Sequence, residues 1–309
     1  MKIYCDWRGL DEADKGAAVA LGNFDGVHLG HQTVIGLAAE AAKRLGAPLG
    51  VVTFDPHPRR IFRPTDPPFR LMSLDQQARA LAALGVERLY LLPFDFEMAN
   101  LTDEGFATEV LAKGLGVRHV AVGFDISFGK GRTGSPEAMA EYGARLGFGV
   151  STAPALLGPH GEKVSSSEVR DFLRDGDPAG AAEVLGRPFA IEGVVRRGRQ
   201  LGRTLGYPTA NVALEDYVAP RLGVYATRTK LPDGRVLPGV ANIGCNPTTG
   251  LVDARLEVFL FDFDEDLYGQ VIETELVAFL RPEAKFDGLP ALIDAIKSDE
   301  AQARAILGP

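Results

Sequence analysis

The sequence has few cysteines, no long apolar run and no excess of positive charge, and each shortage excludes a class of protein. Cys5 and Cys245 are the two cysteines of 309 residues, too few for a disulfide framework and without metal-ligand spacing. No segment approaches the length of roughly 20 apolar residues that crosses a bilayer. The first 16 residues, MKIYCDWRGLDEADKG, lack the apolar core of a signal peptide. The net charge of −8 disfavours general nucleic-acid binding, which needs a basic surface. We therefore expect a cytoplasmic protein whose partners are neither nucleic acids nor membranes.

The composition and length indicate a globular chain of two domains. Hydrophobic residues make up 46% and charged residues 24%, which is typical of a folded protein. A chain of 309 residues is long for one domain and sufficient for two.

Up to about residue 155, short apolar runs alternate with helical patterns. This alternation predicts a parallel sheet covered by helices, whose ligands bind beyond the carboxyl ends of the strands. The expected strands are 17–21, 49–54, 88–94, 119–124 and 148–154, and the expected helices are 31–46, 74–85, 103–115 and 135–147.

After about residue 187, apolar runs follow one another without intervening helices. They predict a small antiparallel barrel, and the turn LPDGR at 231–235 joins two of its strands as a hairpin. A helix over 288–307 closes the chain, and the boundary within 177–189 predicts domains 1–184 and 185–309. The expected strands are FAIEGVVRRG, GVYATRTKL, RVLPGVANIG, ARLEVFLFDF and VIETELVAFLRP.

The stretch LGNFDGVHLGHQ, residues 21–32, follows the first expected strand and is poor core material. Its glycines allow a tight turn and close approach of the backbone to a ligand. His28 and His31 are three residues apart at the start of the expected helix, so they share a face beside free backbone N–H groups. Two imidazoles at a helix N-terminus suit a polyphosphate. The alternative is an ordinary strand-to-helix loop with two surface histidines.

At this stretch the chain resembles the bacterial bifunctional riboflavin kinase/FAD synthetases, which hold ATP with H-x-G-H. The resemblance implies a Rossmann-like nucleotidyltransferase domain of α/β class, followed by an antiparallel β-barrel riboflavin kinase domain with a C-terminal helix. It covers both halves of the chain in order. The motifs that carry it are GNFDGVHLGHQ, TFDPHP, LLPFDFEMANLTDEGF, VGFDISFGKGRTG and VSSSEVRDFLRDGD in the first half, and GRTLGYPTANV, GVYA, VANIGCNPT, LEVFLFDFDEDLYG and FLRPEAKFD in the second.

For the first half, the resemblance implies adenylyl transfer from ATP to FMN, giving FAD and pyrophosphate. The FMN phosphate attacks the α-phosphorus, so positioning and charge stabilisation suffice and no protein nucleophile is needed. Arg170 is the expected cation at the transition state. The resemblance gives ATP-binding roles to Gly22, Asn23, His28, His31, Asp125, Ser166 and Arg170, and flavin-binding roles to Phe54, Phe62 and Phe128. Taken singly, the aromatic residues could equally belong to the core.

For the second half, the resemblance implies phosphorylation of riboflavin to FMN by ATP. Thr209 and Asn211 of the P-T-A-N motif offer hard oxygen ligands for Mg²⁺. Glu257 lies on the face of its strand opposite to the apolar face. The resemblance implies that Glu257 is the base that takes the proton of the ribityl 5′-hydroxyl. The alternative for Glu257 is a solvated strand position. Three further residues complete the implied site, namely Gly202 for ATP, and Arg281 and Phe286 for the flavin.

The sequence departs from the family pattern at four positions, namely 126, 127, 249 and 259. The family often has D-F-R-F-G where this chain has Asp125, Ile126, Ser127, Phe128 and Gly129, so an arginine is missing at position 127. Lys130 and Arg132 could supply the missing cation. Phe259 stands where many relatives have His, and Thr249 where they have Phe.

Two narrower functions remain open at this stage. The first domain could be impaired, leaving a riboflavin kinase alone, although H-x-G-H and SSS-x-x-R are intact. The chain could also be a non-catalytic flavin or nucleotide sensor, for which it shows neither a basic surface nor an added recognition domain. The sequence leaves the oligomeric state open, a weak homo-oligomer included.

Overall fold

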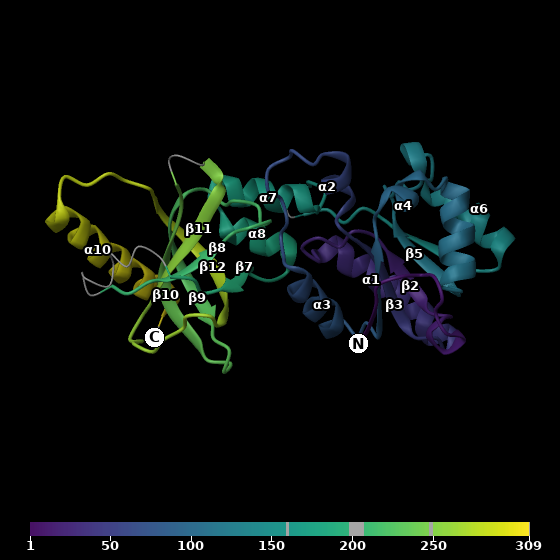
Figure 1. Ribbon diagram of the computed structural model, residues 1–309, viewed down its shortest axis with the longest axis horizontal. Coiled ribbons are helices and arrows are strands. Elements are labelled where there is room, and N and C mark those ends of the chain that lie inside the picture. The colour runs from purple at the N-terminus through teal and green to yellow at the C-terminus, as the bar shows by residue number, and fades with distance from the viewer. Residues whose placement is uncertain (159–160, 198–206, 247–249, 309) are drawn as a thin grey trace. The chain divides into compact units, whose positions relative to one another are not determined.

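The computed structural model describes residues 1–158, 161–197, 207–246 and 250–308, which fold into two compact units (Figure 1). The first unit comprises residues 1–66 and 74–164, and the second comprises residues 67–73 and 165–309. The second unit thus includes a short segment of the N-terminal half. Its backbone joins the second unit through Arg70, whose N–H donates to the Asp216 carbonyl at 2.8 Å and whose carbonyl accepts from Val218 at 2.8 Å.

The first unit contains a six-stranded, wholly parallel sheet in the order β1-β4-β3-β2-β5-β6. The predicted parallel α/β fold is therefore confirmed. All four residues of β2 are buried, as expected for a strand covered on both faces. The strands are β1 (Lys2–Tyr4), β2 (Ala18–Leu21), β3 (Leu49–Asp55), β4 (Arg88–Pro93), β5 (His119–Gly123) and β6 (Gly149–Ala153). The edge strand β1 is the one strand of this sheet that the apolar patterning missed.

Helices connect these strands, and their ends follow local sequence signals. Gly46 ends α1 in the left-handed conformation (φ 57°), and Ser135 caps α6 by accepting the Ala138 N–H at 3.2 Å. The expected helix over 103–115 is divided into one turn of α-helix and a π-helical segment. The helices are η1 (Glu12–Asp14), α1 (Leu29–Leu45), α2 (Pro58–Phe62), α3 (Leu74–Ala83), α4 (Phe96–Asn100), α5 (Asp103–Gly105), η2 (Phe106–Gly114), η3 (Lys130–Arg132) and α6 (Pro136–Leu146).

The second unit is a nearly closed antiparallel barrel in the order β7-β12-β9-β10-β11-β8. A bridge between Arg196 and Asn211 brings the chain that follows β7 back to β8. The predicted barrel is confirmed, with a sixth strand at P-T-A-N. The elements are α7 (Ser166–Asp175), α8 (Pro178–Leu185), β7 (Phe189–Val194), β8 (Ala210–Ala213), β9 (Gly223–Lys230), β10 (Val236–Asn246), β11 (Gly250–Leu260), β12 (Val271–Pro282) and α10 (Leu289–Leu307).

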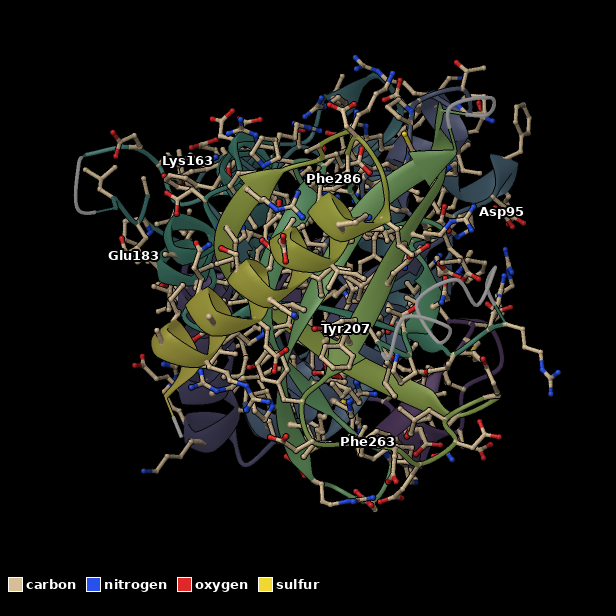
Figure 2. The ribbon with its side chains drawn as sticks, turned by 90° about the vertical axis from the view of Figure 1, so that its left-hand side faces the viewer. Asp95, Lys163, Glu183, Tyr207, Phe263 and Phe286 are labelled. Atoms are coloured by element: carbon tan, nitrogen blue, oxygen red, sulfur yellow. The ribbon has the colours of Figure 1, made fainter. Side chains whose placement is uncertain are left out.

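Helix α10 lies across the barrel strands (Figure 2). Ala303 and Leu307 of this helix pack with Val224 of β9, Val240 of β10 and Phe261, which follows β11, in one apolar cluster. The helix therefore covers the outward face of β9, β10 and β12. Leu256 and Val258 lie on the other face of β11, where their side chains are also buried and fill the interior of the barrel.

Candidate active sites

The turn from β2 to α1 lies at the topological switch point of the parallel sheet. The chain proceeds from β2 through β3 to β4 on one side and then crosses to β5 on the other side of β2. In open parallel sheets, ligands bind outside the carboxyl ends of the strands at this point. Residues 22–28 follow β2 and residues 124–134 follow β5, so both loops border the expected crevice.

His28 and His31 lie together at the N-terminus of α1. His28 is the N-cap, and its Nδ1 accepts the backbone N–H of His31 at 3.2 Å. The two rings are stacked with centroids 3.6 Å apart, and Phe24 packs edge-on against His31 at 5.1 Å. Because Nδ1 of His28 accepts a hydrogen bond, the proton of the neutral ring is assigned to Nε2.

The turn is held in an unusual backbone conformation. Phe24 and Val27 have left-handed φ angles of 49° and 42°, which are uncommon for bulky side chains, and both residues are buried. The carbonyl of Asn23 accepts from Thr53 Oγ1 at 3.1 Å and from Gln77 Nε2 at 2.9 Å. Core side chains therefore fix the backbone of the turn, while the Asn23 side chain is exposed.

Two glycines of this region, Gly22 and Gly30, lie close against neighbouring rings. A Cβ added to Gly22 would lie 3.3 Å from the Phe24 ring. A Cβ added to Gly30 would lie 3.2 Å from Nδ1 and Cε1 of His28. These two positions accommodate Phe24 and His28 because they have no side chain.

Ser166 and Arg170 lie in α7 of the second unit. The N-cap of α7 is Ser165, whose Oγ accepts the Glu168 N–H at 3.2 Å, so Ser166 is the first helical residue. Arg170 is 7% exposed, and its Nε donates to the Phe69 carbonyl at 2.7 Å. The guanidinium also lies 5.6 Å from the Phe69 ring. The segment 67–73 therefore fixes the position of Arg170 within this unit.

Three aromatic residues predicted to bind flavin belong to one row of five phenylalanines. Phe62 packs against Phe94 with centroids 5.7 Å apart, and Phe94 against Phe54 at 5.5 Å. Phe54 then lies 6.2 Å from Phe106, which lies 5.9 Å from Phe128. Phe62 is 65% exposed and forms the open end of the row. Sequence reasoning missed Phe94 and Phe106, although both belong to the motif LLPFDFEMANLTDEGF.

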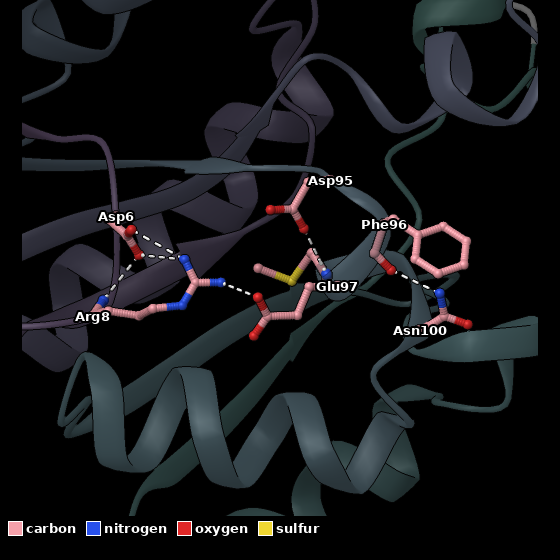
Figure 3. A network of polar contacts seen from close by, with 7 residues as sticks. Asp6, Arg8, Asp95, Phe96, Glu97 and Asn100 are labelled. Atoms are coloured by element: carbon pink, nitrogen blue, oxygen red, sulfur yellow. Dashed lines mark hydrogen bonds and ion pairs between the residues drawn. The ribbon is translucent and has the colours of Figure 1, made fainter.

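The segment that follows Phe94 is fixed by polar contacts (Figure 3). Asp95 caps α4 by accepting the Met98 N–H at 2.8 Å. Arg8 donates to Asp6 and to Glu97, the latter at 2.8 Å, and so ties α4 to the chain after β1. The ring of Phe96 is exposed.

Asp125 follows β5 and forms an ion pair with Lys163. The ammonium of Lys163 also lies 4.8 Å from the ring centroid of Phe124. The predicted ATP-binding position therefore has a cation beside it that sequence reasoning did not identify. Lys163 directly precedes V-S-S-S, which was the available signal.

In the barrel, Glu257 lies in a row of polar side chains across three strands. It is directly opposite Asn211 of β8 and directly opposite Asn242 of β10. Opposed residues of antiparallel strands share a face, with Cβ atoms about 5 Å apart. Asn242 was not predicted as a site residue, because its place beside Glu257 depends on strand register. A Cβ on Gly244 would lie 2.6 Å from Glu283 Oε1, so Glu283 extends the same polar region.

Thr209 and Asn211 lie together beside a pocket of about 370 Å³. The Asn211 amide nitrogen is 3.4 Å from Thr209 Oγ1 and donates to the Thr209 carbonyl at 3.3 Å. Both residues line the pocket, together with Pro208 and the segment 263–268. The Thr209 hydroxyl and the Asn211 amide carbonyl are oxygen ligands of the kind that a hard cation prefers. Within the described ranges, no cluster of three or more His, Cys, Asp or Glu side chains could hold a metal ion.

Arg281 and Phe286 also lie together. The guanidinium of Arg281 is 5.4 Å from the ring centroid of Phe286 and is paired with Asp299 of α10. Arg281 is opposite Val224, which is in turn opposite Asn242, so the flavin-binding candidates continue the row that contains Glu257. Phe259 of the same strand as Glu257 packs against Tyr207 at 5.1 Å. Gly202 and Thr249 lie outside the described residues.

The first unit has two histidines at the switch point of its parallel sheet, and the barrel has an acid beside Thr209 and Asn211. Together these features indicate a two-part transferase that moves groups derived from ATP. Comparisons with known proteins identify the class further. A family model described as FAD synthetase matches residues 10–168, and one described as riboflavin kinase matches residues 185–307.

Curated relatives are similar over the whole chain. The bifunctional riboflavin kinase/FMN adenylyltransferase of Pseudomonas fluorescens is 42% identical over 100% of this chain and 99% of its own length. The enzyme of the same name from Escherichia coli is 40% identical over 100% and 98%. That of Bacillus subtilis is 38% identical over 95% and 93%.

The fold is also similar to a crystal structure described as a macrolide-efflux protein from Streptococcus pneumoniae. The TM-score is 0.87 at 31% identity, covering 98% of both chains. In the part of this chain that the structure describes, no helix has the length and apolarity needed to span a bilayer.

The chain belongs to the bifunctional riboflavin kinase/FMN adenylyltransferase family. The predicted function, a FAD synthetase in the N-terminal half and a riboflavin kinase in the C-terminal half, is confirmed.

Proposed function

We propose that residues 185–309 phosphorylate riboflavin with Glu257 as the base, and that residues 1–184 adenylylate FMN with His28 and His31 at the ATP phosphates. The observation that carries the kinase assignment is the register of β8, β11 and β10, which places Glu257 between Asn211 and Asn242. The stacked pair of imidazoles at the N-cap of α1 supports the adenylyltransferase assignment.

In the kinase reaction, Glu257 accepts the proton of the ribityl 5′-hydroxyl as its oxygen attacks the γ-phosphorus of ATP. The bond to the β,γ-bridging oxygen breaks, and ADP leaves. Thr209 and Asn211 would hold Mg²⁺, which neutralises charge on the phosphates when bound. The nucleotide is assigned to the pocket that Thr209 and Asn211 line together with Pro208 and residues 263–268. Gly202 is assigned to ATP on the resemblance alone.

In the adenylyl transfer, a phosphate oxygen of FMN attacks the α-phosphorus of ATP and pyrophosphate leaves. Nε2–H of His28 donates to the ATP phosphates, and the N-terminus of α1 adds its partial positive charge. Gly22 and Asn23 bind at the same turn. Asp125 is assigned to the nucleotide, and Ser166 and Arg170 to the phosphates, with Arg170 stabilising the transition state.

The flavin ring is expected beside exposed aromatic surface in each half. In the first half, Phe62 and the partly exposed Phe54, Phe94 and Phe128 offer this surface, and the buried Phe106 supports them from the core. In the second half, Arg281 and Phe286 are assigned to the isoalloxazine. Asn242, beside Glu257, is assigned to a ribityl hydroxyl because its amide both donates and accepts hydrogen bonds.

The proposed substrates are riboflavin, FMN and ATP, and the proposed cation is Mg²⁺. A cytoplasmic location follows from the use of ATP as co-substrate. A weak homo-oligomer stays a prediction.

The deciding experiment incubates the full chain with riboflavin, Mg²⁺ and ATP labelled at the α-phosphate. We expect FMN to appear first and labelled FAD to follow, with both products abolished by excess chelator. Formation of FMN without labelled FAD would favour the kinase-only alternative. Binding of flavin without either product would favour the sensor.

A further inference from the structure

The loop after β5 lacks the arginine that relatives often carry at position 127, yet the guanidinium of another arginine contacts the residue at that position. Nε of Arg132 donates to Oγ of Ser127 at 2.8 Å. The hydroxyl of Ser127 therefore accepts a hydrogen bond from the side chain of Arg132, five residues later in the chain. Sequence spacing alone does not show this contact, because it depends on how the loop turns.

The backbone of the loop returns Arg132 to Ser127 through three residues with positive φ angles. Gly129, Gly131 and Arg132 have φ angles of 74°, 74° and 59°. A left-handed conformation is ordinary for glycine, but it costs a non-glycine residue such as Arg132 about 1 kcal/mol. Gly129 also has no room for a side chain, because a Cβ there would lie 2.3 Å from the backbone nitrogen of Asp103.

Contacts with the start of α5 hold the loop in this shape. Asp103 accepts from Thr133 Oγ1 at 3.0 Å and from the Tyr142 hydroxyl at 2.8 Å. The hydrogen bond from Tyr142 lowers the pKa of the Asp103 carboxyl, so the ionised acceptor is favoured. The backbone N–H of Lys130 donates to the Leu101 carbonyl at 2.7 Å. The backbone conformation around Arg132 is therefore held by contacts of Lys130 before it and of Thr133 after it.

The loop also lies where a flavin nucleotide is expected. It follows β5 at the carboxyl edge of the sheet, next to β2 and its histidine turn. Phe128, which adjoins Ser127, is the inner end of the phenylalanine row that begins at Phe62. Phe106 of this row is buried, so a flavin can contact the row only at its partly exposed members, and Arg132 supplies a cation beside Phe128.

We propose that Arg132, seated on Ser127, binds the phosphate of FMN in the adenylyl-transfer reaction and replaces the arginine that the family often has at position 127. The other cations near this edge fit the role less well. Lys163 is already paired with Asp125. The ammonium of Lys130, among the described residues, has no contact that would hold it in place.

This inference rests on the proposed adenylyltransferase function, and the test separates the two. FAD formation from supplied FMN and ATP is measured for the full chain, for Arg132→Gln and for the matched control Lys130→Gln. We expect Arg132→Gln to raise KM for FMN about tenfold or more, as for loss of a charged hydrogen bond, with KM for ATP little changed. Lys130→Gln removes the same charge from the same loop and should change neither constant.

A double substitution that moves the positive charge from position 132 to position 127 makes the test more specific. Ser127→Arg combined with Arg132→Ser returns a guanidinium to the family position and should restore most of the affinity for FMN. Riboflavin phosphorylation by the barrel serves as an internal control for folding and should be unchanged in every variant. Equal effects of the two glutamine variants, or a rise in KM for ATP alone, would overturn the assignment. Absence of FAD from the unsubstituted chain would instead refute the proposed function.

Discussion

Arg281 of β12 and Asp299 of α10 form a two-point ion pair. Nε of Arg281 donates to Oδ1 of Asp299 at 2.9 Å, and Nη2 donates to Oδ2 at 2.7 Å. Asp299 is 3% exposed, so the carboxylate is buried and has its charge balanced by this guanidinium. The C-terminal helix thereby orients the arginine that is proposed to contact the flavin.

Asp299→Asn should weaken riboflavin binding more than it slows the chemical step. Removing one partner of a buried pair leaves the other charge uncompensated and costs about 3 kcal/mol of stability. We expect a lower unfolding midpoint and a raised KM for riboflavin, with kcat and KM for ATP much less affected. Asp299→Glu keeps the charge and should recover part of the affinity.

The control for this variant is Asp262→Asn. Asp262 forms an ion pair with Arg304 of α10, the helix that also contains Asp299, but the Asp262 side chain is 81% exposed. Exposed pairs contribute about 0–1 kcal/mol, so this variant should behave like the unsubstituted chain. A KM for riboflavin that is equal in both variants would show that Asp299 does not position Arg281.

Glu257→Gln should abolish most riboflavin phosphorylation while leaving riboflavin binding intact. The amide keeps the size of the side chain but cannot accept the hydroxyl proton, and general-base catalysis typically contributes about 10²–10⁴-fold. FMN formation and fluorescence-detected riboflavin binding are measured together. FAD formation from supplied FMN should persist, since that reaction belongs to the other half. Unchanged FMN production would end the assignment of Glu257 as the base.

Gly30→Ala should impair FAD synthesis without unfolding the protein. The added methyl group would lie 3.2 Å from the His28 ring, which must shift away from its stacked position on His31. We expect a drop of about tenfold or more in FAD formation, because small displacements of positioning groups are costly. Riboflavin phosphorylation should not change.

Gly36→Ala is the matched control within α1. A Cβ there meets nothing within 4 Å, so the helix should gain about 0.5–1 kcal/mol and keep full activity. If both alanine variants synthesise FAD at the normal rate, the orientation of the His28 ring is not important for catalysis.

Glu275→Gln should stabilise the fold at neutral pH and not at acidic pH. Burial, reinforced by Glu273 and opposed by Arg228, raises the pKa of the Glu275 carboxyl. A carboxyl with a raised pKa binds more protons in the folded state than in the unfolded state. The free energy of unfolding therefore falls as the pH rises from the ordinary pKa of 4.5 through the raised one.

Thermal unfolding of both proteins is compared at pH 7 and near pH 3.5. The glutamine variant should have the higher midpoint at pH 7, and the difference should vanish at the lower pH, where the carboxyl is protonated in both states. A constant difference across the range would contradict the raised pKa.

Much of the secondary structure could be predicted from local patterns. Apolar runs located β2 to β6, and the turn 231–235 correctly joined β9 to β10, where the Leu231 N–H donates to the Arg235 carbonyl at 2.8 Å. The missed strands, β1 and β8, have three and four residues, too few to show a period. Phe94, Phe106, Asn242 and Lys163, which lie beside predicted site residues, were not predicted from the sequence, because their positions depend on the tertiary structure.

The sequence by itself determined the two-part organisation and the family, because these depend on residue types in a fixed order along the chain. The tertiary structure decided which distant residues meet. Strand register places Asn242 beside Glu257, helix packing places Asp299 against Arg281, and the left-handed loop places Arg132 on Ser127. Such contacts arise from the pairing and packing of whole elements, and no local pattern in the chain encodes them.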